Sequence, residues 1–403
     1  MSGEKVYFRN LDAVRFIAAM MVFMGHAVSP SYKYLPIEGT FAGKVLWTIS
    51  TGGTGVSVFF VLSGFLITYL LIKEQEASGR ISLRNFYVRR VLRIWPLYYL
   101  VVGFSMIVYP FLKKMIGMES PTGTNLAYYL TFLSNFDVIN VRKYCFGSDA
   151  MSQNITWSVS VEEQFYLFWP LLFVLLPRRF WLHGILGLIA GSILFRLLNT
   201  NDVQVLYFHT LSVLLDLGIG GLTAYFATKY VRVGRFFRDS STRLHLILLV
   251  VAFTLLLSKD SLFSFAYGNA IGRIFISVSF ALIIAAQALT TRESPLNLRK
   301  LKFASEWGKY TYGIYLLHPL AIQLTDVALR IVHFPRNSFI TLFLVAMVNL
   351  VLTLVISKLS FRYFESPFLR YKEKFATIRS REQPVPKAAV SSGFASGPVQ
   401  PRE

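Results

Sequence analysis

The sequence predicts an all-α, polytopic integral membrane protein, and this prediction depends on its composition and on the length of its apolar runs. Of the 403 residues, 54% are hydrophobic and 15% are charged, and the mean hydropathy is +0.51. A soluble domain could not hide so much apolar surface in one core. Apolar stretches of roughly 20 residues, enough to cross a hydrocarbon layer of ~30 Å, recur along the chain.

These runs divide the chain into about ten candidate transmembrane helices. They lie near residues 11–29, 47–72, 94–116, 157–177, 180–198, 205–228, 244–258, 267–290, 311–332 and 337–360. We expect about ten helices to form one membrane domain over residues 1–375. Beyond it the composition changes to Pro, Ser, Gly and charged residues, so residues 376–403 are predicted to be a disordered cytoplasmic tail.

Charge predicts the orientation of the chain in the membrane. The formal net charge is +20, and Lys and Arg are concentrated in alternate connections between the predicted spans. By the positive-inside rule, both termini then lie in the cytoplasm. We therefore expect a multi-pass protein of the inner (cytoplasmic) membrane whose basic residues meet lipid and not nucleic acid.

The N-terminal residues and the single cysteine set two smaller expectations. No small-residue cleavage site follows the polar N-terminal residues 1–10, so we expect a retained first helix and not a cleaved signal peptide. Cys145, on the longest outward connection near residues 117–156, is the one cysteine of the chain and excludes an intrachain disulfide.

The first predicted span carries an arginine and a histidine eleven residues apart, Arg15 and His26. At ~100° and ~1.5 Å per residue, they share one helix face roughly 16 Å apart along the axis. Alone, Arg15 would be an anchor at the membrane interface and His26 a residue at the helix end. Together on one face, they favour a polar cavity inside the protein, because lipid would not accept both.

Five further stretches complete a known pattern. They read VFFVLSGFLI at 58–67, FYVRRVLRIWPLYY at 86–99, TWSVSVEEQFYLFWP at 156–170, YGIYLLHP at 312–319 and RYFESP at 362–367. With LDAVRFIAAMMVFMGH at 11–26, they resemble, in the usual order, the motifs of the acyltransferase-3 family of integral membrane O-acyltransferases. The similarity covers about residues 7 to 370.

The resemblance implies a reaction. Members of this family move an acyl group, most often acetyl, from acyl-CoA to a hydroxyl of a sugar, polysaccharide or glycolipid. We therefore expect acyl-CoA, and first of all acetyl-CoA, as co-substrate and a hydroxyl-bearing glycan or other small molecule as acceptor. No spacing of His, Cys and carboxylates suggests a metal site.

The resemblance and the residue chemistry together assign the catalytic roles. Neutral imidazole suits removal of a hydroxyl proton, so His26 is the expected base. Arg15 offers a permanent fork of donors to a phosphate or an oxyanion. Glu162 is the acid that follows the Trp-Ser step of its motif, and it either orients His26, as a carboxylate does in a triad, or forms a buried ion pair with an arginine of another helix. Its neighbour Glu163 is expected to be structural.

The arginines of the third predicted span are the expected acyl-CoA contacts. Arg89 and Arg93 lie four residues apart on one helix face, and Arg90 is beside them. They would bind the CoA phosphates at the cytoplasmic mouth. The alternative is that they only orient the chain and contact anionic lipid.

Three further residues are expected to line the substrate cavity: Ser63, Trp157 and His318. Ser63 precedes Gly64 outside any G-x-S-x-G context, which favours a packing role or a cavity wall over a nucleophile. His318 precedes Pro319, so it either lines the same cavity as His26 or bonds a carbonyl that this proline leaves without a donor.

Two other classes of function compete with the enzyme hypothesis. Polytopic proteins with buried charge also transport solutes, so a transporter of a small anionic or glycan solute is the alternative. A non-catalytic membrane partner is the third reading, and the intact set of Arg15, His26 and Glu162 argues against it.

Overall fold

The structure is a computed structural model that describes residues 8–27, 40–50, 52–115, 117, 125–144, 154–334 and 339–375. Cys145 and the tail 376–403 lie outside these residues. The α-helices are α1 (Arg9–Ala27), α2 (Phe41–Ser50), α3 (Gly52–Ser78), α4 (Leu83–Gly103), α5 (Tyr109–Met115), α6 (Leu126–Leu130), α7 (Ser134–Tyr144), α9 (Thr156–Leu175), α10 (Trp181–Leu198), α11 (Val203–Phe208), α12 (Thr210–Lys229), α13 (Val231–Arg238), α14 (Thr242–Leu262), α15 (Gly268–Leu289), α16 (Lys302–Trp307), α17 (Thr311–Ile331), α18 (Phe339–Ser360) and α19 (Ser366–Lys372).

Short helical segments of other kinds connect several of these helices. Two π-helical stretches, Phe104–Val108 and Phe361–Glu365, join α4 to α5 and α18 to α19. Four 3₁₀ turns complete the set, at Arg178–Phe180, Leu298–Lys300, Gly308–Tyr310 and Glu373–Phe375.

The predicted all-α membrane fold is confirmed. Within the described residues, every regular element is helical, and eight helices or runs of helices are long and apolar enough to cross a membrane. They cover Gly52–Ser78, Leu83–Met115, Arg178–Leu198, Val203–Lys229, Thr242–Leu262, Gly268–Leu289, Lys302–Ile331 and Ile340–Phe375. The other two predicted spans are present as α1 and α9, of 19 and 20 residues, which carry polar and ionisable side chains.

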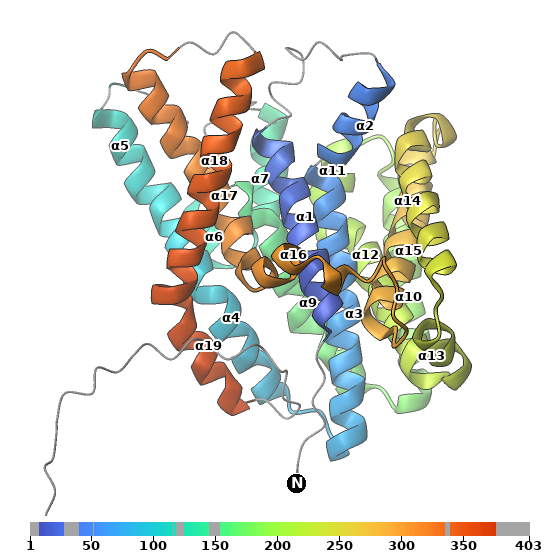
Figure 1. Ribbon diagram of the computed structural model, residues 1–403. Helices are drawn as coiled ribbons and strands as arrows, with labels where there is room; N and C mark the ends of the chain where they lie inside the picture. The colour runs from blue at the N-terminus through green and yellow to red at the C-terminus, as the bar shows by residue number, and fades with distance from the viewer. Residues whose placement is uncertain are drawn as a thin grey trace, which may run out of the picture.

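The helices form an elongated bundle in which most of the long helices run along a common direction (Figure 1). The link from α3 to α4, the short helix α13 and the helix α19 all lie at its lower end, whereas α2 and the end of α5 lie at its upper end. The α3–α4 link, α13 and α19 follow the second, sixth and tenth predicted spans. These are three of the connections that the sequence predicts to be basic. They therefore share one end of the molecule, as the positive-inside prediction requires.

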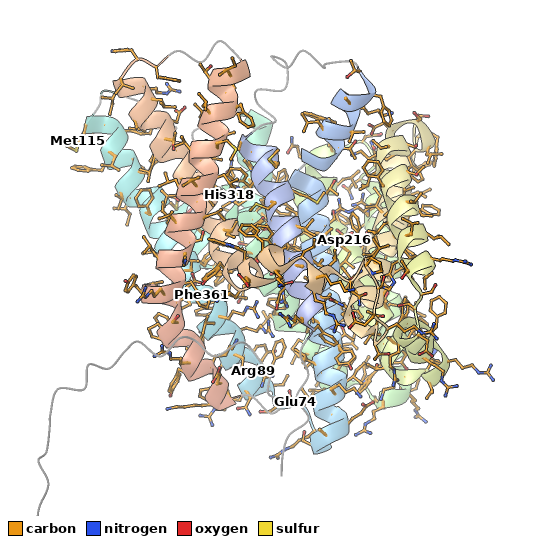
Figure 2. All side chains as sticks on the ribbon, in the orientation of Figure 1. Glu74, Arg89, Met115, Asp216, His318 and Phe361 are labelled. Carbon is orange, nitrogen blue, oxygen red and sulfur yellow. The ribbon has the colours of Figure 1, made fainter. Side chains whose placement is uncertain are left out.

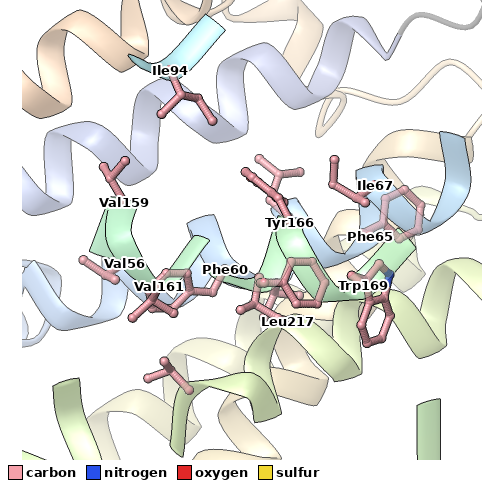
Figure 3. Close-up of a cluster of buried hydrophobic side chains, with 14 of the residues drawn as sticks. Val56, Phe60, Phe65, Ile67, Ile94, Val159, Val161, Tyr166, Trp169 and Leu217 are labelled. Carbon is pink, nitrogen blue, oxygen red and sulfur yellow. The ribbon is translucent and has the colours of Figure 1, made fainter. Parts of the chain in front are cut away.

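A crossing of α3 and α12 holds the centre of the bundle together. A Cβ on Gly64 would overlap the carbonyl oxygen of Leu217, and one on Gly220 would overlap that of Val61. The two backbones therefore approach to a distance that only glycine permits, the small-residue packing typical of membrane helices. Around this crossing, side chains from α3, α9 and α12, Phe60, Phe65, Trp169 and Leu217 among those labelled, fill the interior (Figure 3).

The basic connection after the eighth predicted span does not extend from the end of the bundle. Its helix α16 lies across α1 at about mid-height (Figure 1). A Cβ on Gly308 would lie 2.5 Å from Cβ of Asp12, and Asn10 accepts a hydrogen bond from the backbone N–H of Arg299 at 2.8 Å. The start of α1 is therefore enclosed by protein, which explains how a span can hold Asp12 and Arg15.

Candidate active site

His26 lies in the last turn of α1 and touches a second histidine from α17. Its Nδ1 is 3.1 Å from Nε2 of His318, and the two ring centroids are 5.1 Å apart. His318 is fully buried, and Figure 2 places it in the upper half of the bundle. The predicted proximity of His318 to His26 is thus present in the structure, although 292 residues separate them in the chain.

The hydrogen bonds of the two rings assign their neutral tautomers. Nδ1 of His318 is 3.1 Å from the carbonyl oxygen of Ile314, which can only accept, so this nitrogen carries the proton. Nε2 of His318 is then an acceptor, and Nδ1 of His26 donates to it. The carbonyl oxygen of Val22, 3.0 Å from the same Nδ1, also requires a donor there. The network therefore gives neutral His26 a lone pair on Nε2, the form that a base needs.

His318 contacts His26, and its ring also bonds a backbone carbonyl one turn earlier in α17, that of Ile314. Pro319 has no N–H, so the carbonyl of Tyr315, beside Ile314, lacks its normal donor within the helix.

Tyr315 and Ser158 continue the polar path from α17 to α9. Their hydroxyls are 2.5 Å apart, and the Tyr315 ring lies edge-on to His318 with centroids 6.2 Å apart. Tyr315 is part of the YGIYLLHP motif, but the sequence analysis did not select it. Tyr315 and His318 are three residues apart and so lie on one face of α17. This spacing could have identified Tyr315 as a neighbour of His318 from the sequence.

Glu162 lies one helical turn beyond Ser158, ~6 Å along α9, and it does not contact His26. Among the described residues, its carboxylate accepts hydrogen bonds from Ser63 at 2.7 Å and from Tyr166 at 3.1 Å. The expectation that Glu162 orients His26 directly is therefore corrected, because His318 occupies the place beside His26 and Ser158 is the residue of α9 at that level. The other expectation, that Glu162 meets arginines, fits better, since Arg90 and Arg93 act electrostatically on it.

Ser63 and Trp157 have packing environments. The Ser63 hydroxyl donates to Glu162 and lies 3.1 Å from the Tyr166 hydroxyl, so it is held in the contact between α3 and α9. Trp157 is 5% exposed and packs against the rings of Phe60 and Phe208, with centroids 5.8 and 4.8 Å away. It supports the wall behind Ser158 on the aromatic core.

Arg15 pairs with an acid one turn away. Its Nη1 is 2.6 Å from Oδ1 of Asp12, and the side chains of the two residues are 22% and 12% exposed. The partial exposure leaves the Arg15 guanidinium within reach of a ligand, while Asp12 fixes its position near the lower part of α1.

The three arginines of α4 differ in their surroundings. Arg89 is tethered: it pairs with Glu74 at 3.3 Å and donates to the carbonyl of Phe375 at 2.7 Å. Arg90 lies over the rings of Phe86 and Tyr166, 5.5 and 5.3 Å from their centroids, and its Nε has no partner among the described residues.

Arg93 is the arginine whose guanidinium is best available. Within the described part of the chain it makes no ion pair or side-chain hydrogen bond. Its positive charge interacts electrostatically with the carboxyl groups of Glu162 and Glu365. Arg90 and Arg93 together thus place partly unsatisfied donors beside the Glu162 cluster. They fit an anion better than Arg89 does.

A second buried charge cluster was not anticipated from the sequence. Asp216 of α12 is fully buried and accepts from Nε and Nη2 of Arg273 on α15, at 3.0 and 2.5 Å, and from the hydroxyl of Ser277. In Figure 2, Asp216 lies at a height similar to that of His318, on the other side of α1 and α3. The available signal was the presence of an acid and a base within two apolar spans.

Comparison with known proteins agrees with this arrangement. The family described as an acyltransferase domain, which is the acyltransferase-3 family, matches residues 8–358. The chain belongs to this family. No solved structure matches the chain significantly.

Several curated proteins are similar to this family member. The peptidoglycan O-acetyltransferase OatA of Listeria monocytogenes is 29% identical over 385 residues, covering 86% of this chain and 58% of the relative. A putative peptidoglycan O-acetyltransferase of Bacillus subtilis, YrhL, is 28% identical over 368 residues, covering 83% and 55%. A putative O-acetyltransferase of Staphylococcus aureus is 26% identical over 407 residues, covering 94% and 60%. The chain thus spans less than two thirds of the length of these relatives.

Proposed function

We propose that this protein is a membrane O-acyltransferase that moves an acetyl group from acetyl-CoA to a hydroxyl of a cell-envelope glycan, with His26 as the general base. The observation that carries the proposal is the contact between His26 and His318 inside the bundle. It fixes the His26 ring and leaves the lone pair on Nε2, which is what removal of a hydroxyl proton requires.

The reaction balances on this one residue. Nε2 of His26 takes the proton of the acceptor hydroxyl as its oxygen bonds to the thioester carbonyl carbon. The tetrahedral intermediate then breaks its C–S bond, and the protonated ring returns the proton to the departing thiolate. His318 supports the imidazolium form, because its Nε2 accepts the Nδ1 proton of His26 throughout.

The donor is proposed to be acetyl-CoA entering from the lower, basic end of the bundle. Its phosphates would meet Arg93 and Arg90, and Nε of Arg90 has no partner among the described residues. Arg15 would meet the chain leading to the thioester. The eleven residues from Arg15 to His26, roughly 16 Å of helix, then give the pantetheine arm a path to the base.

The acceptor class comes from the relatives. Two of them carry peptidoglycan O-acetyltransferase in their names, so a peptidoglycan-type sugar hydroxyl is the acceptor that we propose. It would approach from the upper half of the bundle, where His318, the neighbour of His26, lies (Figure 2).

Acetyl transfer by purified protein in nanodiscs tests this function. Wild-type protein, acetyl-CoA and a muramyl oligosaccharide should yield the acetylated sugar by mass spectrometry, and His26→Ala should lose ~10²–10⁴-fold in rate while it still binds CoA. Unmodified sugar that has crossed a proteoliposome membrane would instead identify a transporter. Isotopic label from acetyl-CoA found on His26 without acceptor would show a nucleophile and not a base.

Membrane orientation is proposed on the same basis. A reporter fused after Gly234, in α13, should read cytoplasmic, and one placed near Ser148, outside the described residues, should read external. Finding both reporters on one side would refute the proposed entry of donor and acceptor from opposite ends.

A further inference from the structure

A pocket of about 500 Å³ opens at the lower end of the bundle, away from the His26 site. It lies between α12, α13 and α15, at the same end of the molecule as Glu74 and Arg89 (Figures 1 and 2). Its lining is apolar apart from one hydroxyl and one guanidinium, and consists of Thr223, Phe226, Arg232, Val233, Phe236, Phe237 and Leu282. Its volume is typical of small-molecule sites.

The helix that forms one wall is short, amphipathic and fixed in place. A Cβ on Gly234 would lie 2.7 Å from the carbonyl oxygen of Ala227, so α13 packs closely on α12. At the C-terminal end of α13, the carbonyl of Arg238 accepts a hydrogen bond from the backbone N–H of Thr291 at 3.0 Å. Phe237 is buried, whereas Phe236 is 55% exposed at the pocket. The pocket wall formed by α13 is therefore held in place by packing and by a backbone hydrogen bond.

Two arginine side chains lie at the edge of this apolar pocket. Arg232 lines the pocket, and Arg235 follows it one turn along α13; both side chains are exposed. Neither makes an ion pair or a side-chain hydrogen bond with the part of the chain that the structure describes. The nearby Lys229, by contrast, is paired with Glu76 at 2.9 Å. The two arginines are thus available to an anion next to an apolar slot.

We propose that this pocket binds one anionic glycerophospholipid, with an acyl chain between α12 and α15 and the phosphate on Arg232 and Arg235. An apolar wall beside exposed arginines, on an amphipathic helix at the basic end of a membrane protein, matches the two halves of such a lipid. A soluble anion would use the arginines but not the apolar wall, and a neutral lipid would use the wall but not the arginines. The inference is independent of the proposed acyl transfer.

Native mass spectrometry of the purified protein tests the site with two probes of equal chain length, phosphatidylglycerol and phosphatidylcholine. Wild-type protein should retain phosphatidylglycerol preferentially. Arg232→Gln with Arg235→Gln should reduce that preference by roughly fivefold for each arginine. Arg243→Gln, which removes an exposed arginine at the start of α14 outside the pocket lining, is the matched control and should keep it.

Filling the pocket separates a site from general attraction to a charged surface. Leu282→Trp should displace both lipids while the arginines stay in place. Equal retention of the two lipids by the wild type, or an equal loss in the Arg243→Gln control, would overturn the proposal. So would a Leu282→Trp protein, folded by its melting temperature, that keeps lipid as the wild type does.

Discussion

Replacing His318 by leucine should slow acetyl transfer without removing the base. The substitution deletes the acceptor that lies 3.1 Å from Nδ1 of His26, so the ring loses the contact that fixes its orientation and tautomer. Val22 still offers its carbonyl to the same nitrogen at 3.0 Å. The ring therefore keeps one of its two acceptors, and activity should fall but not vanish.

The size of the effect follows from the hydrogen bond. A neutral hydrogen bond contributes about 0.5–1.5 kcal/mol, and ~1.4 kcal/mol corresponds to a factor of ten in rate. We expect about a tenfold loss in kcat for His318→Leu, compared with ~10²–10⁴-fold for His26→Ala. Stability should fall by about 1 kcal/mol as well, since the carbonyl of Ile314 loses its hydrogen bond from the His318 ring.

A second variant separates orientation from packing. In His318→Gln, the amide can donate to the Ile314 carbonyl and accept from Nδ1 of His26, so kcat should recover toward the wild-type value. The assay is acetyl transfer in nanodiscs, with CoA binding and melting temperature measured on the same samples. Wild-type kcat in His318→Leu, or no difference between the leucine and glutamine variants, would refute the reasoning.

Three further tests, with five substitutions, concern other parts of the structure. Arg93→Ala should weaken acetyl-CoA binding with little change in melting temperature. Arg89→Ala should instead lower the melting temperature, because it removes the guanidinium that lies 3.3 Å from the buried carboxylate of Glu74. Titration of acetyl-CoA and thermal unfolding of both variants check this, and the reverse pattern would contradict it. Gly64→Ala should destabilise the protein by about 1–3 kcal/mol, because the new Cβ would overlap the carbonyl of Leu217. Gly103→Ala is the control, since a Cβ there meets open space and should leave stability unchanged. Denaturation of both variants in detergent measures the difference. Asp216→Ala should cost about 3–5 kcal/mol, because Arg273 would remain buried without its carboxylate, and an unchanged melting temperature would show that the pair is dispensable.

The amino-acid sequence alone predicts where the helices lie and which ionisable residues lie within them. Apolar run length located all ten predicted spans, and each is helical in the described residues, either as one helix or as two successive helices. The motifs selected His26, Glu162, His318 and the arginines of α4 because charged or polar groups in apolar spans are rare and need a reason. These properties are local, since they depend on a residue and its near neighbours along one helix.

The contacts between these residues become apparent in the folded structure. His26 pairs with His318 and not with Glu162, Glu162 pairs with Ser63, and Asp216 pairs with Arg273. In a soluble helix the polar face marks the outside, and the remaining face must touch a neighbour. In a membrane, both the lipid-facing side and the packed side are apolar, so hydrophobic periodicity does not identify the helices that adjoin. The partners are set instead by close approaches such as Gly64 on Leu217, which bring distant segments together. A glycine marks one side of such an approach in the sequence, but nothing in the sequence marks the segment that it meets.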